Sequence, residues 1–367
     1  MRDQNPNKAT MDDIARATGL SKMTVSRVLR NSSLVSEESR KRVLAATKRL
    51  NYHVDFIARQ LRAKHTLQLG VVVPFQGLVG GYYFGQILQG IQQVIAGTDY
   101  HIALFDSHSE GFEDFQRCAT LCHERRVGGL IVVAPGLNEK FPKTFVDLKM
   151  PLIVVGSSFG RQPVSYVDVD NYGGASAMTD HLIHLGHRKI AFIKGRSDLR
   201  DAAQRELGFR KTMAKQRVPI VDKWVVQGDY ETRKAFQLCL NLLGKSDRPT
   251  AIFASNDNMA YGAIDAARIL GLRVPEDLSV AGFDDAEGSA SFVPALTTVA
   301  QPMMDLGRVA ARYLFDMLDK SDAPAILHNV LPAQVVTRAS AAPPSEQLRR
   351  GEPGPYQLGT PQTTRLN

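Results

Sequence analysis

Apolar residues recur at helical spacing in two short stretches near the start of the chain. Thr10 is a good N-cap for a first helix, which should end at Gly19, a residue suited to a sharp turn. Ser21 can cap a second helix immediately afterwards. Its apolar stripe is formed by Val25, Val28 and Leu29. The pattern therefore predicts two short helices joined by a tight turn, a helix-turn-helix.

A third helix is expected after this pair. Ser36 can cap it, and Glu37 and Glu38 would lie near its positive end. Apolar or part-apolar positions recur along it at Val43, Leu44, Thr47 and Leu50. The first 54 residues are thus predicted to be a small all-α headpiece.

From residue 69 the pattern changes to short apolar runs that alternate with segments of helical length. The runs are LGVVVP, HIALFD, GGLIVVAP, LIVVGS, SYVDVD, KIAFIKG, WVVQGD, AIFASND and LSVAGFDD. Such alternation is typical of parallel sheets covered by helices on both faces. Nine strands exceed what one compact sheet usually holds in a chain of this size, so two α/β lobes are expected.

The net charge of +8 is confined to the headpiece and its linker. Residues 1–64 hold 14 Lys/Arg against 6 Asp/Glu, whereas the remaining 303 residues hold 31 of each. A small basic module attached to a neutral body is typical of a protein that neutralises phosphates. There is no run of 18 apolar residues and no secretory signal pattern, so we expect neither a membrane span nor secretion.

The polar face of the second helix is the candidate for reading DNA. The residues that lie off its apolar stripe are Lys22, Met23, Thr24, Ser26 and Arg27. In a helix-turn-helix the second helix enters the major groove, where Lys and Arg can donate to guanine and methyl groups can touch thymine. Thr10 and Ser21, at the two helix starts, are expected to contact DNA as well. The alternative is a solvated face, which the local excess of positive charge disfavours.

These stretches resemble the lactose-repressor (LacI/GalR) family of transcriptional regulators. The headpiece match is ATMDDIARATGLSKMTVSRVLRNSSLVSEESRKRVLAATKRLNYHVD, and LGHRKIAFI, PTAIFASNDNMAYGAIDAARILGLRVPEDLSVAGFDD and PALTTVAQP match the family's ligand-binding core. The resemblance implies a core with the two-lobed fold of periplasmic sugar-binding proteins. It sets the expected domains as headpiece 1–54, hinge or linker 55–68, core 69–340 and a disordered Pro/Gly-rich tail 341–367.

The resemblance also gives the linker a role. In this family a hinge helix forms when two subunits sit on their operator, and a leucine opens a central base step in the minor groove. RQLRAK matches that segment, which makes Leu61 the wedge and Ala58 its packing neighbour. The chain has His53-Val54 where the family usually has a proline, so the hinge would begin less rigidly. An ordinary interdomain linker is the alternative.

No enzyme motif supports catalysis. GxxxxGK[ST] and a strand-anchored GxGxxG are absent, so no cofactor is expected. His181, His184 and His187 straddle a helix end and belong to a stretch typical of the family, which makes a metal site a poor interpretation. Cys118 and Cys122 are expected to be buried, inert thiols.

A binding cleft is the better interpretation of the core, because ligands of open α/β sheets sit beyond the carboxyl ends of the strands. Polar and aromatic residues follow several predicted strands: Tyr83, Phe84, Tyr230, Asn256 and Asp284. The resemblance places Arg205, Tyr230, Asn256, Asp284 and Gln301 at effector contacts, and Phe84 at the opposite side in the purine-repressor branch. Ser157 stands where a lactose-binding member has a carboxylate. Asp257 is expected to cap the following helix, and Asp285 to be structural.

Together these features predict a cytoplasmic, nucleoid-associated repressor that binds a palindromic operator as a homodimer. A sugar or glycoside is the expected effector, which would close the two lobes and change the spacing of the paired hinges. A purine-type corepressor and a partner protein are the alternatives, and a sugar-processing enzyme with a DNA anchor is a remote one. The sequence lacks a C-terminal leucine heptad, which favours a dimer over a tetramer.

Overall fold

Two compact units make up the chain, residues 1–66 and residues 67–367, each with its own hydrophobic core. A computed structural model describes residues 9–29, 34–52, 66–73, 81–106, 113–136, 150–157, 164–319 and 326–346. Across these ranges no helix combines the length and the apolar character that a bilayer crossing requires.

The first unit consists of three helices, α1 (Met11–Thr18), α2 (Lys22–Leu29) and α3 (Glu37–Arg49). The predicted starts and stop are confirmed. Thr10 accepts from the Asp13 backbone N–H, Ser21 accepts from that of Thr24, and Gly19 ends α1 with φ +65°.

The core of this unit is formed by Ile14, Val25, Val28, Val43 and Ala46. Leu44, one of the apolar positions that recur along α3, is 53% exposed. Ala46, three residues after Val43, lies on the buried face instead.

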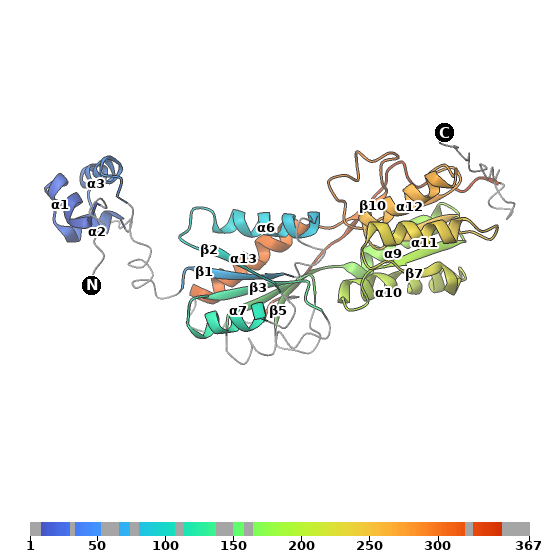
Figure 1. The fold of residues 1–367 in the computed structure, drawn as a ribbon, viewed down its shortest axis with the longest axis horizontal. Helices are drawn as coiled ribbons and strands as arrows, with labels where there is room; N and C mark the ends of the chain where they lie inside the picture. The colour runs from blue at the N-terminus through green and yellow to red at the C-terminus, as the bar shows by residue number, and fades with distance from the viewer. Residues whose placement is uncertain are drawn as a thin grey trace, which may run out of the picture. The chain divides into compact units, whose positions relative to one another are not determined.

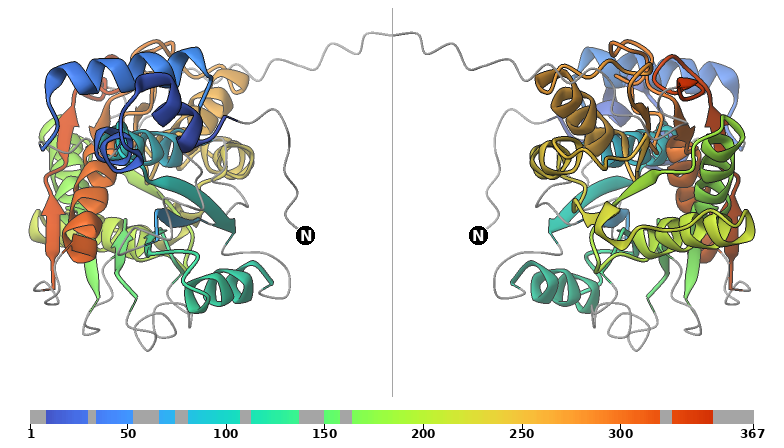
Figure 2. Two further views of the ribbon diagram at one scale, coloured as in Figure 1. Left: turned by 90° about the vertical axis from the view of Figure 1, so that its left-hand side faces the viewer. Right: turned by 90° about the vertical axis from the view of Figure 1, so that its right-hand side faces the viewer.

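The first lobe of the second unit contains a six-stranded parallel sheet with the order β11-β5-β4-β3-β1-β2. The strands are β1 (Gln68–Val73), β2 (His101–Asp106), β3 (Gly129–Val133), β4 (Leu152–Val155), β5 (Ser165–Val169) and β11 (His328–Leu331). Helices α6 (Tyr82–Ile95) and α13 (Met303–Asp319) pack on one face, and α7 (Glu113–His123) covers the other (Figure 1). Helix α7 stays below the sheet in both views of Figure 2.

The second lobe contains a four-stranded parallel sheet with the order β7-β6-β8-β9. Its strands are β6 (Ile190–Lys194), β7 (Val225–Gln227), β8 (Ala251–Ala254) and β9 (Ser279–Ala281), and a 3-10 turn, η1 (Asp222–Trp224), precedes β7. The helices are α9 (Asn171–His184), α10 (Arg200–Lys215), α11 (Thr232–Leu243) and α12 (Asp257–Ile269). A two-stranded antiparallel ribbon of β10 (Thr298–Ala300) and β12 (Gln334–Val336) belongs to the same lobe.

The chain passes between the lobes three times: from β5 to α9, from β10 to α13 and from β11 to β12. The nine predicted strands and the two-lobed α/β fold are confirmed. Strands β10, β11 and β12 were not predicted, because each is three or four residues long and only Pro332 and Ala333 separate the last two.

Candidate functional site

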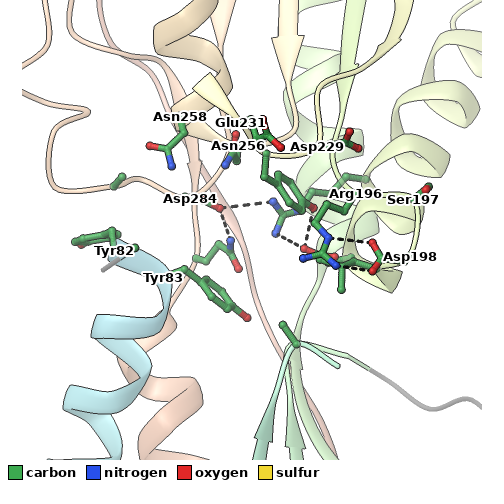
Figure 3. A pocket seen from close by; sticks show the side chains of 18 residues that line it. Tyr82, Tyr83, Arg196, Ser197, Asp198, Asp229, Glu231, Asn256, Asn258 and Asp284 are labelled. Carbon is green, nitrogen blue, oxygen red and sulfur yellow. Dashed lines mark hydrogen bonds and ion pairs between the residues drawn. The ribbon is translucent and has the colours of Figure 1, made fainter. Parts of the chain in front are cut away.

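A cavity of about 580 Å³ lies between the two lobes of the second unit. The first lobe contributes the N-terminal end of α6 and Ala134, which follows β3. The second lobe contributes the segments that follow β6, β7, β8 and β9, as expected at the carboxyl ends of parallel strands. Figure 3 shows Tyr82 and Tyr83 on α6 facing Asp284, Asn256 and the Arg196–Asp198 ion pair across the opening.

Arg205, on α10, is the buried cation of this cavity. Its Nε donates to Asn171 Oδ1 over 2.8 Å, and one terminal nitrogen donates to the Ser255 carbonyl over 2.6 Å. The guanidinium also lies 3.6 Å from carboxylate oxygens of Asp201 and Asp284. These partners fix the guanidinium plane, which lies 3.8 Å from the Phe283 ring centroid.

Three carboxyl groups, those of Asp168, Asp201 and Asp284, interact with the single cation Arg205. Burial raises the pKa of Asp284 to about 8, although Arg205 and a hydrogen bond from Gln301 act in the opposite direction. Burial likewise raises the pKa of Asp168 to about 7; its carboxylate accepts from Asn171, which links it to Arg205. Part of this network is therefore protonated near neutral pH.

Two tyrosines form aromatic walls, and each lies against a glycine. The Tyr83 hydroxyl occupies the place of a Cβ at Gly156, and the Tyr230 ring occupies that place at Gly195. The Tyr230 hydroxyl donates to Asp201 over 2.8 Å. Because both glycines lack a side chain, the rings can lie close to the backbone at the strand ends.

Backbone conformations that favour glycine occur at four non-glycine residues of the cavity wall. The φ values are +44° at Ala134, +55° at Asp229, +66° at Tyr230 and +130° at Asp284. Such conformations are costly, and they concentrate at binding sites where the surrounding structure enforces them. Their presence supports a functional role for the cavity.

Six of the eight predicted effector residues line the cavity: Tyr83, Arg205, Tyr230, Asn256, Asp284 and Gln301. Phe84 and Ser157 do not. Phe84 is 6% exposed and belongs to the core of the first lobe. It follows Tyr83 on α6, and because consecutive side chains of a helix point about 100° apart, the two rings face different sides. Ser157 is buried behind the end of β4.

The helix cap at α12 also differs from the prediction. Asn256 is the N-cap and accepts from the Met259 backbone N–H over 2.9 Å. Asp257 is instead a buried acid that accepts from Ala286 N–H and from the Ser289 and Thr298 hydroxyls. Asp285 forms an ion pair with Arg338 over 2.7 Å, in agreement with the structural role expected for it.

Further lining residues were missed from the sequence: Tyr82, Arg196, Asp198, Asp201, Asp229, Glu231 and Asn258. A signal existed for two of them. Asp201 precedes Arg205 by four residues, so the pair shares a helix face. Arg196 follows β6 directly and could have been recognised as a strand-end residue.

The polar face of α2 is open to solvent. Met23 is 63% exposed, and Lys22 forms an exposed ion pair with Asp12 over 2.9 Å. The hydroxyls of Ser21 and Thr24 lie 2.9 Å apart at the start of the helix, and Arg27 is exposed in its last turn. Thr10 has its hydroxyl in the capping box of α1. Ala58 and Leu61 lie outside the described residues.

In the part of the chain that the structure describes, the histidines and cysteines do not form a recognisable metal site. No group of three His, Cys, Asp or Glu suited to a metal occurs in the described ranges. His187 is buried, with one ring nitrogen 3.0 Å from the Thr250 hydroxyl and the other 3.0 Å from the Ser279 hydroxyl. Cys118 and Cys122 are buried thiols.

Comparison with family models matches both units. Residues 10–55 match the model of bacterial regulatory proteins of the lacI family, and residues 179–341 match that of a periplasmic binding protein-like domain. The HTH-type transcriptional repressor PurR of Photorhabdus laumondii is 33% identical over 344 residues, covering 93% of this chain and 100% of the relative. PurR of Erwinia tasmaniensis is 31% identical over 348 residues with the same coverage.

Solved structures show the same architecture. The lac repressor dimer bound to operator and the anti-inducer ONPF superposes with a TM-score of 0.77 at 27% identity, covering 91% of this chain and 99% of that one. A complex of the transcriptional regulator CelR with cellobiose gives 0.70 at 28% identity, covering 91% and 100%.

Proposed function

The chain belongs to the lacI family of bacterial regulatory proteins, and from this membership we propose that it represses transcription by binding a palindromic operator as a homodimer. It is a DNA-binding regulator and not an enzyme. In the proposed complex α2 of each subunit enters the major groove, with Lys22 and Met23 at base edges. Such a repressor acts where the bacterial chromosome is, in the cytoplasm.

The effector that we propose is a purine-type molecule. The observation that carries this proposal is the similarity to PurR relatives over 93% of the chain, because it includes the cavity as well as the headpiece. Tyr83 and Tyr230, on opposite lobes, offer π-faces to a flat ring. The sequence favoured a sugar, and the cellobiose complex of CelR keeps a sugar as the second candidate.

The coupling between cavity and DNA is proposed to act through the crossovers. Gln301 lies in the β10–α13 crossover, and Asn171, the partner of Arg205, follows the β5 crossover. A ligand that holds both lobes would change the angle at these segments and hence the spacing of the two hinge segments, which contain Ala58 and Leu61. Leu61 is proposed as the minor-groove wedge.

Binding measurements with the purified full chain test the effector class. Equilibrium dialysis would compare purine bases with cellobiose, and operator affinity would be measured with and without each compound. We expect a purine base to bind and to change operator affinity by at least about fivefold, the lower range of allosteric coupling. Binding of cellobiose alone would replace the purine proposal with the sugar one.

A further inference from the structure

Two of the three cysteines of the chain lie next to each other in the first lobe. Cys118 and Cys122 are four residues apart on α7, so they share one face of that helix. Their side chains are 0% and 5% exposed, and both pack among apolar residues such as Phe105 and Leu130 in the layer between α7 and the sheet. The Cys118 thiol donates a hydrogen bond to the sulfur of Cys122. The fold therefore holds two thiols within reach of each other.

The chemical environment of this pair differs from that of the third cysteine. The hydrogen bond from Cys118 lowers the pKa of Cys122, although burial acts in the opposite direction. Cys239 lies on α11 in the second lobe, where burial raises its pKa to about 12. Because the thiolate is the nucleophile, an oxidant should react with Cys122 much faster than with Cys239.

A small cavity lies beside the pair. It has a volume of about 350 Å³, it borders the edge strand β2, and Phe105, Arg117 and Leu121 belong to its lining. Arg117 and Leu121 each precede one of the two cysteines on α7, and Phe105 packs in the same apolar cluster as both thiols. Hydrogen peroxide is little larger than a water molecule, whose share of liquid volume is about 30 Å³, so it fits into this cavity. A small uncharged oxidant can thus reach the edge of the layer that contains the pair.

We propose that Cys118 and Cys122 form a reversible disulfide when a peroxide oxidises Cys122. The Cys122 thiolate attacks a peroxide oxygen, an S–O bond forms, the O–O bond breaks, and the proton that Cys122 gave up converts the leaving hydroxide to water. The Cys118 sulfur then attacks the sulfenic acid. An S–S bond forms, the S–O bond breaks, and the leaving hydroxide takes the Cys118 proton to become a second water. Two thiols are oxidised to one disulfide while one peroxide is reduced to two waters.

Helix geometry allows this disulfide but strains it. Residues four apart on an α-helix have Cα atoms about 6 Å apart, within the range of disulfides, but their Cβ atoms lie about 5–6 Å apart and must approach to about 4 Å. The last turn of α7 must therefore tighten. It leads directly into a turn in which the Cys122 carbonyl accepts from the Arg125 N–H over 3.0 Å. Strained disulfides are easily reduced, so the bond should be reversible.

Oxidation of the purified full chain tests the proposal. The chain would be treated with hydrogen peroxide, alkylated, and analysed by intact-mass and peptide mass spectrometry. We expect Cys118 and Cys122 to be lost together, with the loss of two hydrogen atoms, at least about tenfold faster than Cys239. Dithiothreitol should restore all three thiols. Persistence of the pair as thiols, or loss of all three cysteines at one rate, would overturn the proposal.

Three variants assign the roles of the two thiols. Cys118→Ala should leave Cys122 as a sulfenic acid that dimedone traps, because the second thiol has been removed. Cys122→Ala should leave Cys118 reduced, and a dimedone adduct on Cys118 would overturn the assignment of Cys122 as the attacking thiol. Cys239→Ala is the matched control, a buried cysteine outside the pair, and should form the disulfide at the rate of the unmodified chain. If either variant of the pair does not fold, the unmodified chain and this control still decide whether the disulfide forms.

Discussion

The polar side chains of α2 and those of the cavity are held in opposite ways. On α2, Lys22, Met23 and Arg27 are exposed, so Met23 can be changed without disturbing the packing of Val25 and Val28. In the cavity they are buried and joined to one another, with Arg205 as the common partner. A DNA groove is recognised by a face presented to solvent, whereas a small ligand is recognised by a network formed before it arrives.

This difference separates effects on specificity from effects on folding. A substitution on the α2 face should change the preferred DNA sequence and leave stability nearly intact. A substitution within the cavity should affect ligand binding and stability together, because removing one member leaves other buried groups without partners. Five predictions test that separation, from the largest expected effect to the smallest.

Arg205→Met should have the largest effect. The change leaves Asp201 without its cation and the Asn171 and Ser255 oxygens without their donor, and breaking a buried pair typically costs about 3–5 kcal/mol. We expect a corresponding loss of unfolding free energy and no measurable effector binding. Urea unfolding and equilibrium dialysis would measure the two effects.

Arg210→Met is the matched control on the same helix. Arg210 pairs with Glu206 over 2.7 Å but is partly exposed, so its removal should cost less than about 1 kcal/mol. A similar loss of stability in both variants would show that the buried pairs of Arg205 contribute no more to stability than the partly exposed pair of Arg210.

The pH dependence of effector binding should follow Asp284. Its pKa is raised to about 8 by burial, so the empty cavity holds this carboxyl protonated at pH 6. A ligand N–H requires the ionised form, and binding then releases a proton. Affinity should therefore rise with pH by up to about tenfold per unit and level off above pH 8, and Asp284→Asn should flatten the profile.

The folding stability of the unliganded protein should change with pH in the opposite direction to effector affinity. A raised carboxyl pKa means that the folded state binds the proton more tightly than the unfolded state, whose Asp pKa is near 3.8. Stability is then greatest at low pH and falls as pH rises toward 8. Asp168, with a pKa of about 7, adds to this fall, so Asp284→Asn should reduce the slope of Tm against pH without abolishing it.

The same contrast explains what the sequence could predict. Helical spacing identified Val25 and Val28 as core and Met23 as exposed, because a single helix decides which side is buried. Within the cavity, Tyr83 and Phe84 are adjacent and both aromatic, and only packing against the sheet determines that Phe84 turns inward. Asp198 and Asn258 lie in segments whose positions depend on tertiary structure, so no local pattern identified them.

Lys22→Ala and Met23→Ala should each change base preference by about 1–3 kcal/mol at one or two operator positions. The free energy of unfolding should change by less than about 1 kcal/mol, because both side chains are exposed and the Lys22–Asp12 pair is a surface pair. Selection from a randomised operator library would compare each variant with the unmodified chain. Leu44→Ala, at an exposed apolar residue on α3, should alter neither quantity, and a shifted base preference there would contradict the assignment of α2 as the reading surface.

Gly156→Ala and Gly97→Ala should show the smallest effects. The pair distinguishes the cost of backbone strain, which both variants share, from an effect on effector binding. Both glycines have left-handed backbone, with φ +75° and +81°, so each substitution should cost roughly 1 kcal/mol of stability. A Cβ at Gly97 meets open space, whereas a Cβ at Gly156 would collide with the Tyr83 hydroxyl. Only Gly156→Ala should therefore weaken effector binding, by several-fold, because it displaces one aromatic wall. Equal affinities in the two variants would show that the position of Tyr83 does not matter to the ligand, and the aromatic contact would then rest on Tyr230.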